Sequence, residues 1–388
     1  RYYHGPSGEV LDAYISGRFD LGSAPIDVRL GKHAVIWGEG LFGSTNAISY
    51  SQAPNDARKA LANPAATAKE TALATKQVSA VAQVTDELTI AGLYSFEWAP
   101  NRLPEGGTFF AAADFLFDGP NVGRAPAVEG EKGDIGLSLR WKPEFMDGGT
   151  FGAYLRRFDE KQPWPAQRVA AGTRSAYAPD VELLGLSMTR VVGGISVSSD
   201  LSYRRNMPLN SAGPSADGMG ARGETLHAVV NGVKLWGNSS WFSSASLAAE
   251  VGVSHLVKVT DNAANFRTKG NPATGCATDD TLAGCSSKNF WTVGAAFTPV
   301  WQQTLPGVDV SLPVFYSINF KGNAATNGGG NEGFQVLKVG ISALADSKHK
   351  FDLAATFYKA KSDSQRGLIN GAPYDDKANL VFTYLVSF

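Results

Sequence analysis

The chain has 388 residues, and its 35 Lys and Arg residues balance 36 Asp and Glu residues, so no excess of positive charge points to a nucleic-acid partner. Charged residues make up only 18% of the chain and glycine is abundant, at 43 residues, which favours strands joined by turns over helices. No run of roughly 18 apolar residues offers a transmembrane helix. The chain opens on RYYHGPSGEV without a signal peptide, and we expect an N-terminal portion to be missing.

Apolar and polar residues alternate along most of the chain. In residues 308–321 the apolar side chains fall on every second position, which is the pattern of a strand with one apolar and one polar face. Most such segments span roughly ten to fifteen residues, longer than the usual five or six of soluble sheets and long enough to cross a bilayer at a tilt. We expect strands centred near residues 16, 30, 80, 93, 139, 154, 186, 200, 231, 250, 296, 314, 340, 356 and 382.

The connections between these strands are of two kinds. Links such as VVGG, FMDGGT and LPG are very short, whereas long polar links cover roughly residues 39–74, 102–132, 161–179, 207–223, 260–288, 322–332 and 362–376. Tight turns at one end and long loops at the other are typical of an outer-membrane barrel. The sequence therefore predicts a single all-β domain over residues 1–388, a transmembrane antiparallel β-barrel with short periplasmic turns and long extracellular loops. An odd count of about 15 visible strands implies at least one more upstream, which makes about 16.

The first long connection, residues 39–74, leaves the two-residue period after Trp37 and has helical character from Asp56 to Ala62. It is too long for a tight turn, and we expect it to fold inward as a constriction or plug of the lumen, or to cover the barrel mouth. Together with the apolar part of the next long loop, it supplies the candidate constriction residues Trp37, Glu39, Phe42, Asn46, Asp56, Phe109, Phe110 and Asp114.

Residues that face the lumen decide what passes through a barrel, and the alternation assigns charges of both signs to that face. No ring of a single sign occurs, so neither an anion channel nor a cation channel is indicated. These side chains could line a wet channel, or they could pair with one another and hold a closed barrel together. They are Arg18, Asp20, Asp27, Arg29, Arg140, Arg156, Asp200, Arg204, Lys234, Glu250, Asp309, Lys338 and Asp352.

The two cysteines of the chain, Cys276 and Cys285, lie close together in the long loop at residues 260–288. We expect them to form a disulfide, which an oxidising periplasm or cell surface permits. A zinc pair is the alternative, but neither a histidine nor another cysteine lies nearby in the sequence.

The last nine residues, LVFTYLVSF, carry an apolar stripe that ends on an aromatic residue. We expect this stripe to face lipid, with its last ring at the interfacial aromatic girdle. Bacterial outer-membrane proteins commonly end in such a strand, which the insertion machinery recognises, and by that resemblance Phe382, Tyr384 and Phe388 form a candidate membrane-insertion signal. The alternative is the last strand of a soluble β-domain.

Catalysis finds little support in the sequence. The histidines are scattered, and none lies in HExxH, GxSxG or another spacing that places a base beside a nucleophile. We therefore expect no enzyme, no metal site and no cofactor. A lipid hydrolase built on His255 and a nearby serine is the alternative.

Two stretches resemble a known family. VRLGKHAVIWGEGLFGSTNAISY (28–50) with the polar stretch after it (51–76), and LTIAGLYSFEWAPNRLPEGGTFFAAADFL (88–116), are similar to the proteobacterial outer-membrane family catalogued as domain of unknown function thirteen-oh-two. Residues 180–190, 201–210 and 315–324 fit the family too. One loop differs, because it has SQAPNDARKA where the family has Asn-Pro directly before Asp. The matching residues are Arg29, Gly31, Trp37, Gly38, Glu39, Glu70, Glu97, Trp98, Pro100, Pro104, Gly107, Thr108, Phe109, Phe110 and Asp114.

This resemblance implies a large porin-like barrel that moves hydrophobic compounds or lipids, beside a periplasmic lipoprotein and an RND-type transporter as partners. The apolar residues of the long loops next to a polar lumen also suit a hydrophobic or amphiphilic small molecule. We therefore expect an outer-membrane channel or transporter for such solutes, in contact with outer-membrane lipid. A structural or assembly barrel with a sealed lumen is one alternative, and an outer-membrane lipid hydrolase is another.

Overall fold

The structure of the protein is a computed structural model that describes residues 8–22, 24–42, 45–62, 71–114, 125–131, 133–170, 172–212, 217–278 and 280–387. Two predicted residues, Glu70 and Phe388, lie outside the described residues. The regular structure is almost entirely β-strand, and none of the described helices is long and apolar enough to cross a membrane.

One antiparallel sheet of sixteen strands dominates the fold. β14 and β15 lie end to end between β13 and β16, so the two share one position and the sixteen strands occupy fifteen positions across the sheet. Every predicted strand centre falls inside an observed strand. The predicted all-β antiparallel architecture is therefore confirmed. The strands are β1 (Ala13–Leu21), β2 (Ala24–His33), β3 (Thr75–Gln83), β4 (Leu88–Ser95), β5 (Ile135–Trp141), β6 (Thr150–Phe158), β9 (Val181–Val192), β10 (Ile195–Pro208), β11 (Arg222–Trp236), β12 (Ser244–Asp261), β13 (Asn289–Leu305), β14 (Val308–Ser311), β15 (Val314–Lys321), β16 (Gln335–Ala345), β17 (His349–Lys359) and β20 (Asn379–Val386).

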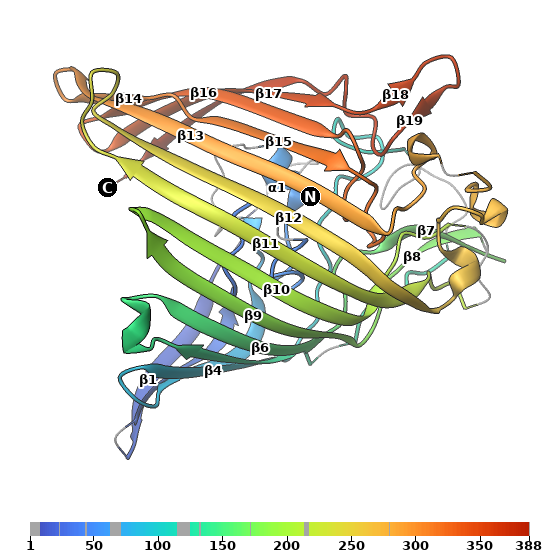
Figure 1. Ribbon diagram of the computed structural model, residues 1–388, viewed down its shortest axis with the longest axis horizontal. Coiled ribbons are helices and arrows are strands. Elements are labelled where there is room, and N and C mark those ends of the chain that lie inside the picture. The colour runs from blue at the N-terminus through green and yellow to red at the C-terminus, as the bar shows by residue number, and fades with distance from the viewer. Residues whose placement is uncertain are drawn as a thin grey trace.

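Long loops and tight turns lie at opposite ends of this sheet (Figure 1). The turn between β9 and β10 is only two residues, Gly193 and Gly194, both with positive φ, as a tight hairpin that follows the strand twist requires. Two small hairpins and several single turns of 3-10 helix lie in the outer loops, and a short helix lies in the connection between β2 and β3. These are β7 (Trp164–Val169) with β8 (Gly172–Ala176), β18 (Ser362–Asp363) with β19 (Leu368–Ile369), α1 (Ala57–Ala62), η2 (Ala263–Asn265), η3 (Pro272–Thr274) and η4 (Thr281–Ala283), while η1 (Glu144–Met146) lies in a turn.

The convex face of the sheet is apolar and uncovered. Ile15, Leu155 and Leu380 are 71%, 55% and 68% exposed, although each belongs to a regular strand. Near the turn end the rings of Trp141, Phe145 and Phe151 contact one another, as in the aromatic girdle of a membrane barrel. Contact between water and so large an apolar surface would be energetically unfavourable, so we assign this face to the lipid of the membrane.

The sheet has two edge strands. Among the described residues β1 pairs only with β2, and β20 pairs only with β17. The additional upstream strand expected from the sequence stays a prediction. In β20 the predicted outward stripe is present, since Phe382 and Tyr384 are 65% and 48% exposed on the convex face.

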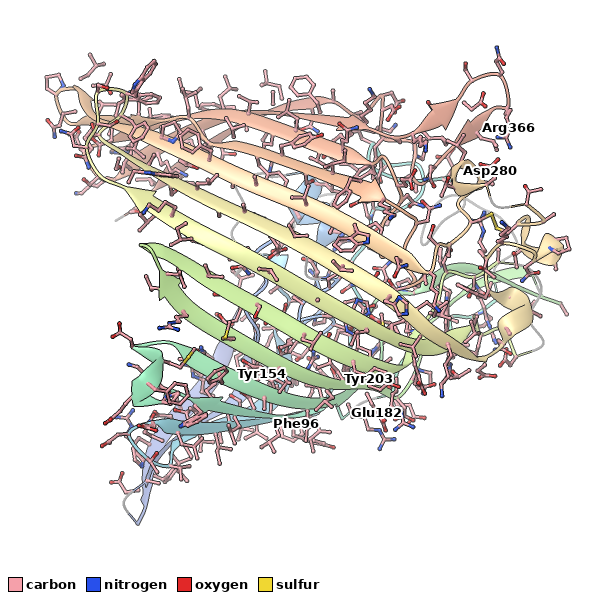
Figure 2. The ribbon with its side chains drawn as sticks, viewed as in Figure 1. Phe96, Tyr154, Glu182, Tyr203, Asp280 and Arg366 are labelled. Carbon is pink, nitrogen blue, oxygen red and sulfur yellow. A yellow bond between two sulfur atoms is a disulfide. The ribbon has the colours of Figure 1, made fainter. Side chains whose placement is uncertain are left out.

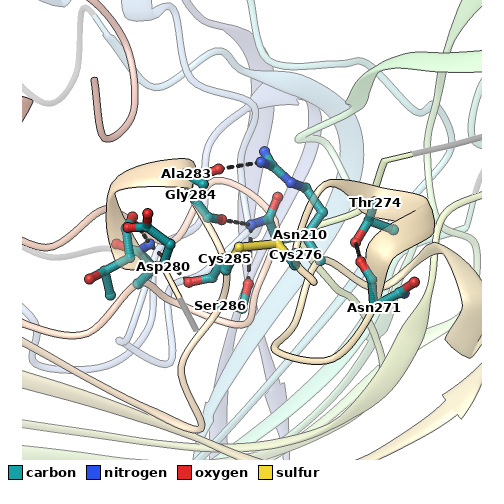
Figure 3. The surroundings of a disulfide bond; sticks show 12 residues. Asn210, Asn271, Thr274, Cys276, Asp280, Ala283, Gly284, Cys285 and Ser286 are labelled. Atoms are coloured by element: carbon teal, nitrogen blue, oxygen red, sulfur yellow. Dashed lines mark hydrogen bonds between the residues drawn. A yellow bond between two sulfur atoms is a disulfide. The ribbon is translucent and has the colours of Figure 1, made fainter. Parts of the chain in front are cut away.

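A disulfide joins Cys276 and Cys285, as predicted, and both cysteines are buried within the outer loops (Figure 3). The Asn210 side chain donates to the carbonyl of Gly284 and to the hydroxyl of Ser286, each at 3.1 Å. The disulfide loop is therefore bound to the loop that follows β10.

Candidate functional site on the concave face

Residues that are paired across neighbouring strands point to the same face, so the pairing register assigns side chains to one face throughout the sheet. For example, Asp200 on β10 lies opposite Ser187 on β9 and Val229 on β11, so these three side chains share the concave face. Continued in both directions, this register places on the concave face every charged residue predicted to line the lumen, with one exception.

The exception is Lys234, which lies opposite Ile195 and Leu247 on the convex face. Its prediction as a lumen residue was wrong. Lys234 stands near the turn end of β11, where a long aliphatic stem lets an ammonium group reach the membrane interface from the lipid side. A charge close to a strand end is therefore a weak indicator of the face.

The chain between β2 and β3 turns inward and lies inside the curve of the sheet (Figure 1, blue). We call its residues 37–42 and 45–50 the inward segment. The side chains of Ile48 and Tyr50 are buried in a cluster with Tyr154, Phe158 and other residues of the concave face. Four predicted constriction residues, Trp37, Glu39, Phe42 and Asn46, belong to this segment.

Two charged residues of β10 bind the backbone of the inward segment. The Asp200 carboxylate accepts hydrogen bonds from the N–H groups of Glu39 and Ile48, at 3.0 Å each. The Arg204 guanidinium donates to the carbonyls of Thr45 and Ala47, at 2.8 and 2.9 Å. Both side chains are buried, so their charges are compensated by backbone groups that would otherwise lack partners.

Neighbouring strands repeat the arrangement. On β6, Arg156 donates to the carbonyls of Ile48 and Tyr50, at 2.9 and 2.7 Å. On β12, the carboxylate of Glu250 accepts the N–H groups of residues 41–42. Carboxylates thus bind the N–H groups and guanidinium groups bind the carbonyls, which fixes the position of the segment along the sheet.

Two uncharged residues of β11 complete this set. Asn231 donates from its amide to the carbonyl of Glu39 at 2.6 Å. The ring of His227 is buried between the side chains of Asn46 and Thr225, at 3.0 and 2.9 Å. Sequence analysis missed both residues, although their inward positions in the alternation of β11 could have indicated them.

Glycines on the concave face make room for the side chains of the inward segment. A Cβ atom added at any of four such glycines would lie between 2.7 and 3.2 Å from one of these side chains. Side chains at these positions would displace the segment, so glycine there is a packing requirement. The contacts are Gly136 with Trp37, Gly185 with Ile48, Gly252 with Asn46 and Gly294 with Phe42.

The inward segment does not fill the whole concave face. A cavity of about 800 Å³ lies along β1 to β4, where Arg18 pairs with Asp27 at 2.7 Å and Trp37 forms part of the wall. A second cavity, of about 700 Å³, lies between the segment and the outer loops and is lined by residues that include Arg29 and Tyr50. The polar groups in both cavities have mixed charge.

The remaining predicted residues lie elsewhere on the concave face or in the loops. Arg140 reaches Glu39 at 3.3 Å, and Asp20 lies opposite Pro25 on the part of β1 next to its turn. Asp352 pairs with Lys350 at 3.1 Å in a small cavity of about 240 Å³ that Lys338 also lines. Asp309 accepts the backbone N–H of Gln303 at the turn end.

Among the loop residues, Asp56 is buried and pairs with Arg58 and Arg102, at 3.2 Å each, away from the inward segment. Burial raises the pKa of Asp56, but these guanidinium groups outweigh burial and hold the pKa below its usual range. Phe109 and Phe110 contact each other, and Asp114 is exposed. The structure thus brings only part of the predicted constriction set together.

The hydrolase alternative finds no support in the placement of His255. Its ring accepts or donates a hydrogen bond with Asn289 at 2.6 Å, and the register places it opposite Leu226, on the convex face. The described residues also contain no group of three or more His, Cys, Asp or Glu side chains that could hold a metal ion.

A sheet of long antiparallel strands with an apolar outer face, a polar inner face, tight turns at one end and long loops at the other defines an outer-membrane β-barrel protein. The protein is of this class, in the bacterial outer membrane. The family described as "Protein of unknown function (DUF1302)" matches residues 1–388, and the chain belongs to this family. The resemblance found in the sequence is therefore confirmed.

Comparison with other proteins adds little to this assignment. No curated protein matches the chain. One similar solved structure is in-vitro folded OmpT, an outer membrane protein of Vibrio cholerae, in its trimer form, with a TM-score of 0.34 and 9% identity over 80% of this chain and 91% of that chain. Another structure of in-vitro folded OmpT has a TM-score of 0.32 and 10% identity over 80% and 88% of the two chains. Similarity at these TM-scores supports no conclusion about the function of this protein.

Proposed function

We propose that the protein passes hydrophobic or amphiphilic small molecules across the outer membrane, beside the inward segment. The proposal rests on one observation, which is that the inward segment covers only part of the concave face. The inward segment is bound to β6 and β10 to β12, whereas a cavity of about 800 Å³ lies along β1 to β4. A solute would then move along the uncovered strands while the inward segment narrows the lumen.

The lining of this cavity suits an amphiphile. Arg18, Asp27 and Arg29 supply charged groups, while Val81 and Trp37 supply apolar surface. A charged pair such as Arg18 with Asp27 has no net charge, so it would not select ions of one sign. A solute with both a polar group and an apolar body would find partners for both in the same cavity.

The test is uptake into liposomes that contain the full-length natural protein, with a fluorescent dodecanoate as the solute. Ala91 lines the cavity on the concave face, and Ala91→Trp should reduce uptake severalfold because the indole ring fills the passage. The matched control is Ile90→Trp, whose side chain lies on the convex face and should leave uptake unchanged.

The competing function is a structural barrel with a sealed lumen. It would give no uptake in the natural protein, and none after removal of residues 38–50. Uptake that is unaffected by Ala91→Trp would also count against the proposed path.

The family resemblance adds a partner to this proposal. A periplasmic lipoprotein or an RND-type transporter would deliver or collect the solute at the tight-turn end, which the barrel orientation places in the periplasm. A photo-crosslinker at Trp241, an exposed side chain in the turn between β11 and β12, should capture such a partner. A crosslinker at Phe109 in an outer loop is the control and should not.

A further inference from the structure

Three charged residues form a row on the convex face. Arg157 on β6 lies opposite Glu182 on β9, and Glu182 lies opposite Arg205 on β10. Glu182 and Tyr203 are neighbours near the loop end of these strands (Figure 2). Since the middle of the convex face is apolar, this row marks its border with the polar region of the membrane.

The next row toward the turn end holds three leucines, and Tyr203 continues it on β10. Leu137, Leu155 and Leu184 lie opposite one another on β5, β6 and β9, and each is half exposed. Gly92 on β4 continues the row without a side chain. Because Gly92 has no side chain beside these leucines, the surface is hollowed there. The resulting groove has a volume of about 810 Å³ and extends from the leucines to Arg157 and Arg205.

We propose that this groove binds a glycerophospholipid, with its acyl chains along the leucines and its phosphate at Arg157 and Arg205. A phospholipid has the same sequence of groups as the groove, an anionic phosphate at the polar border followed by hydrocarbon. Neighbouring strands are about 4.8 Å apart, so β5, β6 and β9 together offer a width of about 10 Å. That width suits two acyl chains, whereas the several chains of lipid A need a broader surface.

Both guanidinium groups keep donors for a phosphate. Arg157 uses Nε and Nη2 to bind Asp180, and Arg205 uses Nη1 to bind Glu182. A guanidinium group has five N–H donors, so each arginine retains N–H groups for the phosphate oxygens. The carboxylates fix the two guanidinium groups in place and reduce the entropy that binding would cost.

The test measures lipid binding to the full-length natural protein in non-ionic detergent by native mass spectrometry. The probes are dioleoylphosphatidylglycerol and dioleoylglycerol, which has the same acyl chains but no phosphate. We expect the phospholipid to bind roughly tenfold more tightly, because only its phosphate forms charge-assisted hydrogen bonds with the arginines. The double variant Arg157→Gln with Arg205→Gln should bind both lipids equally.

Two further variants separate binding from folding. Lys258→Gln removes a cation of the same face, paired with Glu224 outside the groove, and should leave the tenfold preference intact. Gly92→Leu should weaken binding of both lipids, because the new side chain fills the groove. A Cβ atom at Gly92 would meet only the carbonyl of Gly136 at 3.8 Å, so the backbone can stay in place.

Three results would overturn the proposal. They are equal binding of the two lipids by the natural protein, an unchanged preference in the double arginine variant, and tighter binding of lipid A than of the phospholipid.

Discussion

Asp200 on β10 accepts a hydrogen bond from the backbone N–H of Ile48, a residue 152 positions earlier in the chain. On the same face of the same strand, Arg204 binds the carbonyls of Thr45 and Ala47. A carboxylate accepts and a guanidinium group donates, so one strand satisfies both kinds of backbone group around residues 46–48, the part of the segment that is buried. The inward segment is therefore part of the packed structure of the protein.

Replacement of Asp200 by Asn should loosen the inward segment. Asn has one uncharged acceptor in place of two carboxylate oxygens, and the lost hydrogen bonds should cost roughly 2 kcal/mol. Hydrogen exchange at the amides of Glu39 and Ile48 should become faster. Asp27→Asn on β2 is the control, because Asp27 pairs with Arg18 and does not bind the segment. Unchanged exchange in Asp200→Asn would contradict this account of the site.

Replacement of Gly185 by Val should destabilise the protein by about 1–3 kcal/mol through overpacking. The new Cβ would lie 2.9 Å from the Ile48 side chain. The matched control is Gly232→Val on the convex face, where a Cβ would meet only Ile195, at 3.4 Å. Urea unfolding followed by tryptophan fluorescence should show a lower midpoint for the Gly185 variant alone. Equal midpoints would mean that the segment does not pack against β9.

Replacement of Cys276 by Ser should open the outer loop at residues 260–288 and leave the sheet intact. The disulfide closes a ring of about ten residues, and its loss should cost about 2–3 kcal/mol of local stability. Limited proteolysis should then cut this loop faster, while the urea midpoint stays the same. A fall in that midpoint would show that the loop stabilises the sheet.

Acid should weaken the contact between two outer loops. The hydrogen bond from Arg366 and its charge hold the pKa of Asp280 below its usual range. Because the pKa is lowered in the folded protein, the pair stabilises the loops above the ordinary aspartate pKa of about 3.9, and this contribution is lost as the pH falls through the lowered value. Hydrogen exchange in residues 362–376 should rise below about pH 4. In Arg366→Gln, exchange should already be high at neutral pH and change less with acid.

A charge on the lipid side of the last strand should cost more than the same charge on its other side. Phe382 lies on the convex face, and Phe382→Arg should destabilise the protein in lipid vesicles by about 2–4 kcal/mol. Thr383→Arg places the same side chain on the concave face and should cost much less. If both variants lose equal stability, the convex face does not lie in lipid.

The alternation of polar and apolar residues was enough to predict the strands, because each strand has one side toward lipid and one side toward the lumen. For the same reason the faces of Arg18, Asp200 and Glu250 followed from their positions in the chain. The two cysteines, nine positions apart in a polar loop, were enough to predict the disulfide. These are local properties, which depend on a period of two residues or on a short separation in sequence.

The sequence alone did not determine what the concave face binds. The side chains of Asp200 and Arg204 could have lined water or paired with each other, and only the folded chain shows that they bind residues 45–50. The inward glycines are equally uninformative in the sequence, where Gly185 does not differ from Gly232. Such contacts join residues more than a hundred positions apart, so they depend on the curvature and register of the whole sheet, and no local pattern records them.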